Sequence, residues 1–158
     1  AAKMAAKDAT VDEIIARLDA VRATIDEVFI VDDLQNLVRG GRLSNASAFI
    51  GSLLKIKPLL TFDETSHEIV AFEKVRSRKK ALVRVEDIFQ EALDQVDYPL
   101  RAIVIDGNDP EGGENWLKQI QTKFPNIPIE RGYFGPVIGT HLGEKSLALA
   151  WMLDTDKA

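Results

Sequence analysis

Apolar residues recur along this chain with two different spacings, and the spacing predicts where helices and strands lie. Near the start they recur every three or four residues, which is typical of an amphipathic helix. The positions concerned are Val11, Ile14, Ile15, Leu18 and Val21. Thr10 and Glu13 precede this stretch with the spacing of a capping box, in which each side chain satisfies a free backbone amide. We therefore expect leading helices within residues 1–25.

The same helical spacing returns twice in the second half of the chain. A long helix is predicted from about Arg78, with a buried stripe formed by Ala81, Leu82, Val85, Ile88, Phe89, Ala92, Leu93 and Val96. A second helix is predicted after Asp109 and Pro110, because aspartate is a favoured N-cap and proline fits the first helical position. Its inner face is Trp116, Leu117, Ile120 and Phe124, and Pro125 ends it.

Short β-prone runs predict strands between these helices. They are residues 28–31, 56–62, 68–75, 102–105, 127–130 and 137–140. The turn residues 63–66 make the second and third of these a β-hairpin, in which Pro58 requires an edge position or a bulge. Residues 101–130 read as strand, helix, strand, which predicts a parallel pair with a right-handed crossover. We expect a closing helix over residues 145–153.

Two brief helices are predicted before the hairpin. Asp32 or Asp33 caps the first, which Gly40 and Gly41 stop, and Ser44 or Asn45 caps the second, over residues 46–54. Together the elements predict an α/β fold, a mixed β-sheet flanked by helices, in a single domain over residues 1–158.

Composition narrows the functional classes. The chain has 158 residues, no cysteine and a net charge of −5, so thiolate chemistry is excluded and bulk electrostatics disfavour nucleic acid as a partner. It has no apolar run of the roughly 18 residues that a membrane helix needs, and no signal peptide opens it. We expect a cytoplasmic protein that is not inserted in a membrane.

His141 is the main candidate for chemistry, since the chain holds only two histidines. It stands between Gly139–Thr140 and Gly143, which would let a ligand or backbone approach closely. We expect it at the carboxyl end of a strand, where it could bind an anionic oxygen such as a carboxylate or phosphate. The alternative is a buried or turn histidine satisfied by backbone. His67 falls in the hairpin turn, so we expect neither a metal site nor a cofactor.

Two other segments carry weaker signals. Residues 74–80 form the only dense basic cluster, and cations at a helix N-terminus are unfavourable unless an anion or an acidic partner surface relieves them. The alternative is a solvated face. Residues 39–60 combine a Gly-Gly turn, Arg42 and Ser44 with a long apolar stretch. Its apolar residues could belong either to the core or to the wall of a ligand tunnel. They are Phe49, Ile50, Leu53 and Leu54.

Several stretches together resemble the DegV family of bacterial fatty-acid-binding proteins. They are "VDDLQNLVRGGRLSNASAFIGSLLKIKPLL", "FEKVRSRKKAL" and "GPVIGTHLG", in that order. The resemblance covers nearly the whole chain but only the second half of a DegV protein. It implies an excised C-terminal lipid-binding domain whose missing N-terminal domain supplies further ligand contacts. It also implies a protein without catalytic residues that presents the bound acyl carboxylate to a separate fatty acid kinase.

The resemblance also assigns roles to residues. His141, with Thr140 and Gly139, matches the family motif that helps bind the fatty-acid carboxylate, and the GGR turn ends at Arg42. Arg76 or Arg78 matches the arginine implicated in contact with the kinase. This chain departs from the family by placing Glu144 beside the expected carboxylate site.

Two further functions remain open at this stage. One is a phosphoryl- or acyl-transfer enzyme with His141 as acid and base, and the other is a protein-docking domain that uses residues 74–80.

Overall fold

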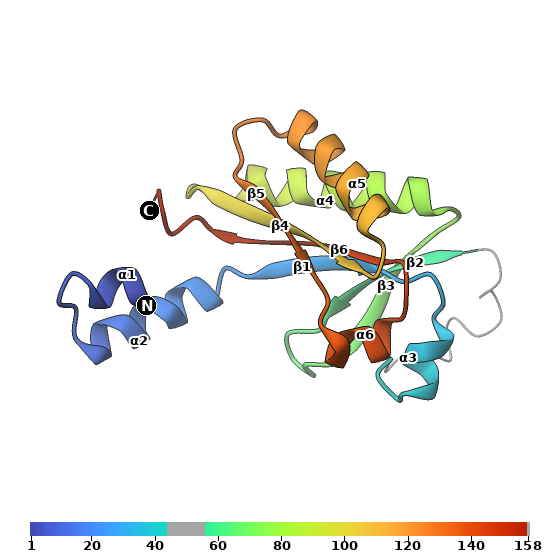
Figure 1. Cartoon of the computed structure of the whole chain (residues 1–158), viewed down its shortest axis with the longest axis horizontal. Coiled ribbons are helices and arrows are strands. Elements are labelled where there is room, and N and C mark those ends of the chain that lie inside the picture. Colours follow the sequence, from blue (N-terminus) through green and yellow to red (C-terminus); the bar gives the residue numbers. More distant parts are fainter. Residues whose placement is uncertain (44–55, 158) are drawn as a thin grey trace.

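The computed structural model describes residues 1–43 and 56–157. These residues form one mixed six-stranded sheet with helices on both faces (Figure 1), which confirms the predicted α/β class. The strands are β1 (Asp26–Ile30), β2 (Lys57–Phe62), β3 (Ile69–Val75), β4 (Leu100–Gly107), β5 (Ile129–Tyr133) and β6 (Ser146–Leu153).

The strands lie in the order β3-β2-β1-β6-β4-β5. Only β4 and β5 pair in parallel, and α5 (Pro110–Lys123) connects them, which confirms the predicted strand–helix–strand unit. The β2–β3 hairpin is antiparallel as predicted. Because β2 lies between β3 and β1, Pro58 is not on an edge strand. Instead the β2–β3 register shifts between Leu59 and Leu60, so the bulge is the alternative that the structure confirms.

The helices divide between the two faces of the sheet. Figure 1 shows α4 (Arg78–Gln95) and α5 together on one face, and the short α3 (Gln35–Arg39) and α6 (Pro136–Leu142) on the other. The capping box of α2 (Val11–Arg22) is present, with the Glu13 amide donating to Thr10 Oγ1 and the Thr10 amide donating to Glu13 Oε2. Asp109 caps α5 as predicted, since its Oδ1 accepts from the Gly112 amide at 3.1 Å.

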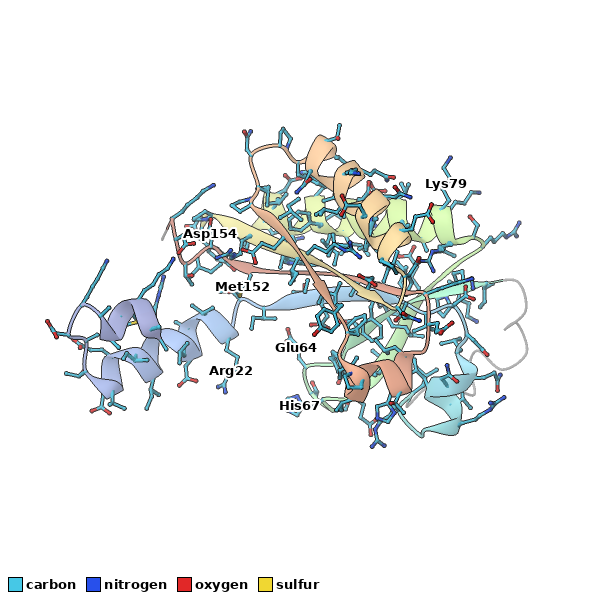
Figure 2. All side chains as sticks on the ribbon, viewed as in Figure 1. Arg22, Glu64, His67, Lys79, Met152 and Asp154 are labelled. Atoms are coloured by element: carbon cyan, nitrogen blue, oxygen red, sulfur yellow. The ribbon has the colours of Figure 1, made fainter. Side chains whose placement is uncertain are left out.

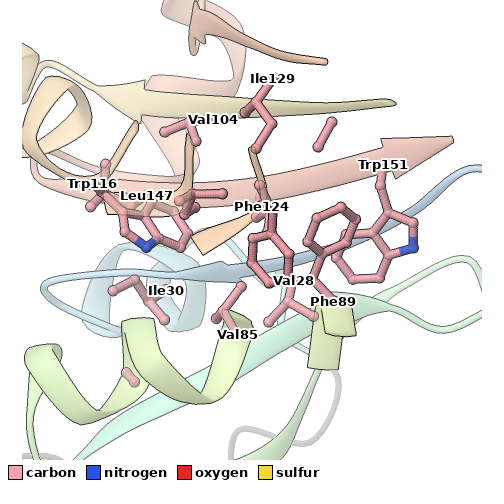
Figure 3. Close-up of a cluster of buried hydrophobic side chains, with 14 of the residues drawn as sticks. Val28, Ile30, Val85, Phe89, Val104, Trp116, Phe124, Ile129, Leu147 and Trp151 are labelled. Carbon is pink, nitrogen blue, oxygen red and sulfur yellow. The ribbon is translucent and has the colours of Figure 1, made fainter. Parts of the chain in front are cut away.

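The main core lies between the sheet and α4 and α5 (Figure 3). Phe89 is fully buried at its centre, with its ring centroid 5.1 Å from that of Phe124 and 5.3 Å from that of Trp151. Glu86 is also buried on this face, and its carboxylate accepts hydrogen bonds from Trp116 Nε1, Gln119 Nε2 and Lys123 Nζ. The predicted stripe of α4 supplies the helical side of this core.

Two predicted elements are wrong, and both lie at the end of the chain. Residues 137–140 are not a strand but part of α6, which begins at Pro136 after Gly135. Residues 146–153 are not a helix but β6, a central strand between β1 and β4. A strand buried on both faces reads as a continuous apolar run, and periodicity cannot distinguish it from a buried helix.

The leading helices stand apart from the sheet. α1 (Ala2–Ala5) and α2 contain no buried residue, and Arg22 at the end of α2 lies away from the sheet (Figure 2). Val11, Ile15 and Leu18 keep about half or more of their surface exposed, although they share the apolar face of α2. Among the described helices, none is long and apolar enough to span a membrane.

Candidate functional site

Two motifs that lie a hundred residues apart in sequence meet at one end of the sheet. The first follows α3 as Gly40, Gly41 and Arg42, and the second forms α6 and its C-cap, Gly143. A Cβ at Gly40 would lie 3.4 Å from His141 Nδ1, and a Cβ at Gly143 would overlap the side-chain amide of Asn36. Gly143 therefore lets α3 and α6 pack closely together, and Gly40 lies within contact distance of His141.

A chamber of about 340 Å³ opens beside this junction on the α3 and α6 face. Its walls are mostly apolar, and the twelve lining residues come from five strands, from α6 and from the segments after α3 and β5. They are Glu27, Phe29, Arg42, Phe62, Ile69, Ile105, Phe134, Ile138, His141, Leu142, Ala148 and Ala150. β6 contributes only two small side chains to the lining, Ala148 and Ala150, and this leaves space above the strand.

Two side chains with hydrogen-bond donors, Arg42 and His141, line the chamber at its α3 and α6 end. Arg42 is exposed and its Nη1 donates to the Gly40 carbonyl at 3.3 Å. His141 is half-buried in the last turn of α6. The expectation that His141 lies at a strand end is wrong, since residues 137–140 are helical. The structure nevertheless brings it beside the GGR turn and into the same chamber as Arg42.

Among the described residues, the other predicted site residues do not line the chamber. Thr140 is exposed, and its hydroxyl donates to the Pro136 carbonyl at 2.6 Å, so it is engaged within its own helix. A Cβ at Gly139 would meet open space. Ser44 and the proposed tunnel residues Phe49, Ile50, Leu53 and Leu54 lie outside the described residues. Glu144 accepts from Asn108 Nδ2 at 3.0 Å and does not line the chamber.

The basic cluster divides into committed and exposed side chains. Arg78 pairs with Asp109 at 2.6 Å and also donates to the Lys145 carbonyl. The positive charge of Arg78 at the start of α4 is therefore balanced by Asp109 of the same chain. Arg76 is exposed, and no hydrogen bond or ion pair joins it to another of the described residues.

Glu27 is a polar lining residue that the sequence analysis did not identify. Its Oε1 accepts from Thr61 Oγ1 at 3.1 Å and from the Phe62 amide at 3.0 Å. Burial raises the pKa of its carboxyl group, an effect that these two hydrogen bonds oppose. The available signal was the spacing of two between Glu27 and Phe29, which places both side chains on one face of a strand.

The remaining titratable residues do not form a second centre. His67 lies exposed in the β2–β3 turn with a φ of 58° (Figure 2). The prediction that Asp32 or Asp33 caps α3 is wrong, because Leu34 is the N-cap and no side chain caps the helix there. Asp33 Oδ1 accepts from the Gln35 amide at 2.8 Å, and Asp32 pairs with Lys57 at 2.8 Å. Within residues 1–43 and 56–157, no group of three or more His, Asp or Glu side chains is placed to hold a metal ion.

Known proteins share both the sequence and the fold. A model of the DegV family of uncharacterised proteins matches residues 1–154. A DegV domain-containing protein of Listeria monocytogenes, lmo2514, is 53% identical over 153 residues, which is 97% of this chain and 53% of that protein. Protein DegV of Bacillus subtilis is 46% identical over 140 residues, which is 89% of this chain and 49% of that protein.

Solved structures give the same result. A fatty acid binding DegV family protein of Streptococcus agalactiae superposes with a TM-score of 0.84 at 35% identity, over 97% of this chain and 53% of that one. The fatty acid binding protein DegV of B. subtilis superposes with a TM-score of 0.80 at 42% identity, over 97% and 54%. The chain thus spans about half the length of these relatives, and it belongs to the DegV family.

Proposed function

We propose that this chain is a fatty-acid-binding module whose chamber holds part of a long-chain carboxylate. The observation that carries the proposal is one apolar chamber with Arg42 and His141 reaching it from the same end. The fatty acid binding described for the S. agalactiae and B. subtilis relatives supports the same class of ligand.

The chemistry of the chamber suits the two parts of such a ligand. Each buried methylene contributes about 0.8 kcal/mol, so apolar walls favour a long hydrocarbon tail. A carboxylate leaving water needs hydrogen bonds from charged or polar donors. Arg42 supplies guanidinium donors, and the imidazole of His141 supplies one N–H when neutral and two when protonated. The chain's own residues therefore offer groups suited to the carboxylate and to part of the tail.

The other half of a DegV protein belongs to this proposal, because several large apolar side chains are exposed among the described residues. Ile138 and Phe62 are exposed at the chamber, Val137 is exposed beside Ile138, and Val11 and Ile15 are exposed on α2. A soluble protein normally covers such a collection of apolar surface. We assign this surface to the half of the protein that precedes this chain in its relatives, and that half would also close the site.

The module would present the acyl carboxylate to a separate kinase that phosphorylates fatty acids, and it would not catalyse the reaction itself. Arg76 is the better placed of the two candidate contact residues. Arg78 is held by Asp109 and the Lys145 carbonyl, whereas Arg76 is exposed at the end of β3.

The ligand role is tested by fatty-acid binding to the natural polypeptide that contains this chain. We expect His141→Ala to weaken octadecanoic acid binding by about tenfold, the effect of losing one hydrogen bond to a charged group. His67→Ala is the matched control, since it removes the other histidine from an exposed turn outside the chamber. Equal affinity in the His141 variant and the wild type would refute the assigned role.

The kinase contact is tested separately. Arg76→Glu should reduce phosphorylation of the bound acid while leaving fatty-acid affinity unchanged. Arg22→Glu, on α2, makes the same charge change at another exposed position and should alter neither. Turnover without any kinase, with a pH profile that disappears in His141→Ala, would instead establish the enzyme alternative.

A further inference from the structure

The fatty-acid chamber contains a carboxylate that its proposed function does not use. Glu27 lies on β1 opposite Ala150 of β6, and Phe29 lies opposite Ala148, so all four side chains point to the chamber side of the sheet. β1 ends at Ile30 and leads into α3, so Glu27 lies toward the opposite end of the strand from Arg42 and His141. Residues with polar groups therefore line this apolar chamber at two separate points.

Only one of the two oxygens of Glu27 has a hydrogen-bond partner among the described residues, and the other is open to solvent. Oε1 accepts from Thr61 Oγ1 and from the Phe62 amide. None of the described residues donates a hydrogen bond to Oε2, and no ion pair joins Glu27 to any lysine, arginine or histidine among them. Asp26 precedes it with a like charge, while Arg42 donates to Gly40 rather than to Glu27.

This arrangement has a consequence for the ligand. An unsubstituted hydrocarbon tail that fills the chamber excludes water from Oε2 and offers it no donor, and an unpaired buried acceptor is costly. A tail that carries a hydroxyl group at the level of Glu27 supplies that donor. Hydrogen bonds from a hydroxyl to a carboxylate are among the stronger ones in proteins.

We propose that Glu27 sets the acyl selectivity of this chamber, favouring chains that carry a hydroxyl group along the tail over unsubstituted chains of the same length. The inference rests on the proposed fatty-acid function and adds the class of acid. It requires discrimination that depends on hydroxyl position, because Glu27 contacts only one part of the tail.

The test is a binding series with octadecanoic, 2-hydroxyoctadecanoic, 12-hydroxyoctadecanoic and 18-hydroxyoctadecanoic acids. At least one of the two acids substituted along the tail should bind the wild-type protein about tenfold more tightly than octadecanoic acid. The 2-hydroxy acid, substituted next to the carboxylate, should not. Glu27→Leu should abolish the preference and bind octadecanoic acid more tightly than the wild type does.

Glu27→Gln keeps the size and the acceptor for Thr61 and Phe62, so it guards against a folding defect in the leucine variant. It replaces Oε2 by an amide nitrogen and should lower the hydroxyl preference to less than half. The inference is overturned if the wild type binds octadecanoic acid as tightly as both tail-hydroxylated acids and neither variant changes this. The proposed function would then still stand. Failure of the wild type to bind any of the four acids overturns both.

Discussion

The two faces of the sheet differ in the length of the helices that cover them. On one face, α4 and α5 extend over 18 and 14 residues and enclose Phe89, Phe124, Trp116 and Trp151. Even the buried Glu86 has three donors there. On the other face, α3 and α6 have 5 and 7 residues, and they cover only one end of the strands.

Two cavities lie on the part of the second face that the described residues leave open. Besides the chamber, a cavity of about 390 Å³ adjoins Ala150 and includes Ile103 and Met152 in its lining. These side chains are half-buried although they belong to central strands. A smaller cavity of about 200 Å³ lies at the end of α4. Among the described residues, the α4 and α5 face therefore holds the larger closed core, while the α3 and α6 face holds the open chamber. The predictions below test that division.

The largest expected effect concerns one phenylalanine on each face. Phe89→Ala removes a fully buried ring that contacts two other aromatic rings and should lower the free energy of unfolding by about 3–5 kcal/mol. Phe62→Ala removes a ring that is 48% exposed at the chamber and should cost less than about 1 kcal/mol. Chemical denaturation measures both. Similar losses would show that the two faces contribute equally to stability.

The sequence predicted the α4 and α5 face well because its signals are local and mutually consistent. The Asp109–Pro110 start and the periodic stripe of α4 each specify a helix without knowledge of the rest of the fold. The end of the chain failed for the opposite reason. Alanine, leucine and methionine favour helices, yet in β6 they form a central strand because pairing with β1 and β4 outweighs intrinsic propensity.

The candidate site divides in the same way. Recurring glycines and a rare histidine identified the GGR turn and the region of His141, and the structure brings them together. Glu27 could not be recognised, since a single acid at the start of a strand is ordinary in sequence. Its place in an apolar chamber depends on the register with Ala150 and on α6, neither of which the sequence reveals. Thr140 matched the motif but points its hydroxyl into its own helix.

An intermediate effect is expected when one alanine on each face is enlarged. Ala81→Leu inserts bulk into the closed core between α4 and the sheet and should destabilise the protein by about 1–3 kcal/mol. Ala150→Leu places the same bulk in the chamber floor, where space exists, and should change stability by less than about 1 kcal/mol. It should also weaken fatty-acid binding by at least about tenfold, since the leucine occupies ligand volume. Unimpaired binding in the Ala150 variant would contradict the chamber assignment.

A smaller effect separates two glycines that flank His141. Gly143 has a φ of 78°, and a Cβ there would overlap Asn36, so Gly143→Ala should destabilise the α3–α6 contact by about 1–2 kcal/mol. Gly139 is helical with open space beside it, so Gly139→Ala should stabilise the protein by up to about 1 kcal/mol. Thermal unfolding of both variants measures the difference. Destabilisation of equal size would mean that α6 tolerates no change on either side.

The smallest effect is the pH dependence of two carboxylates with opposite shifts. Burial raises the pKa of Glu27 above its usual 4.5, so the folded state binds more protons than the unfolded state, and stability falls as the pH rises through the interval above that value. A hydrogen bond from Lys57 lowers the pKa of Asp32 below its usual 3.8, so its contribution is present above that value and is lost as the pH falls below it.

The variants Glu27→Gln and Asp32→Asn therefore test the two opposite pH dependences. Relative to wild type, Glu27→Gln should gain stability as the pH rises from about 4 to about 7, because it removes a buried charge that the wild type must carry. Asp32→Asn should lose stability relative to wild type as the pH rises from about 2 to about 4, because the wild type gains its favourable charged form in that interval and the variant does not. Thermal unfolding from about pH 2 to about pH 7 measures both trends. Parallel curves for Glu27→Gln and wild type would place the Glu27 carboxyl in water, and the chamber would then lack the polar point on which its acyl selectivity depends.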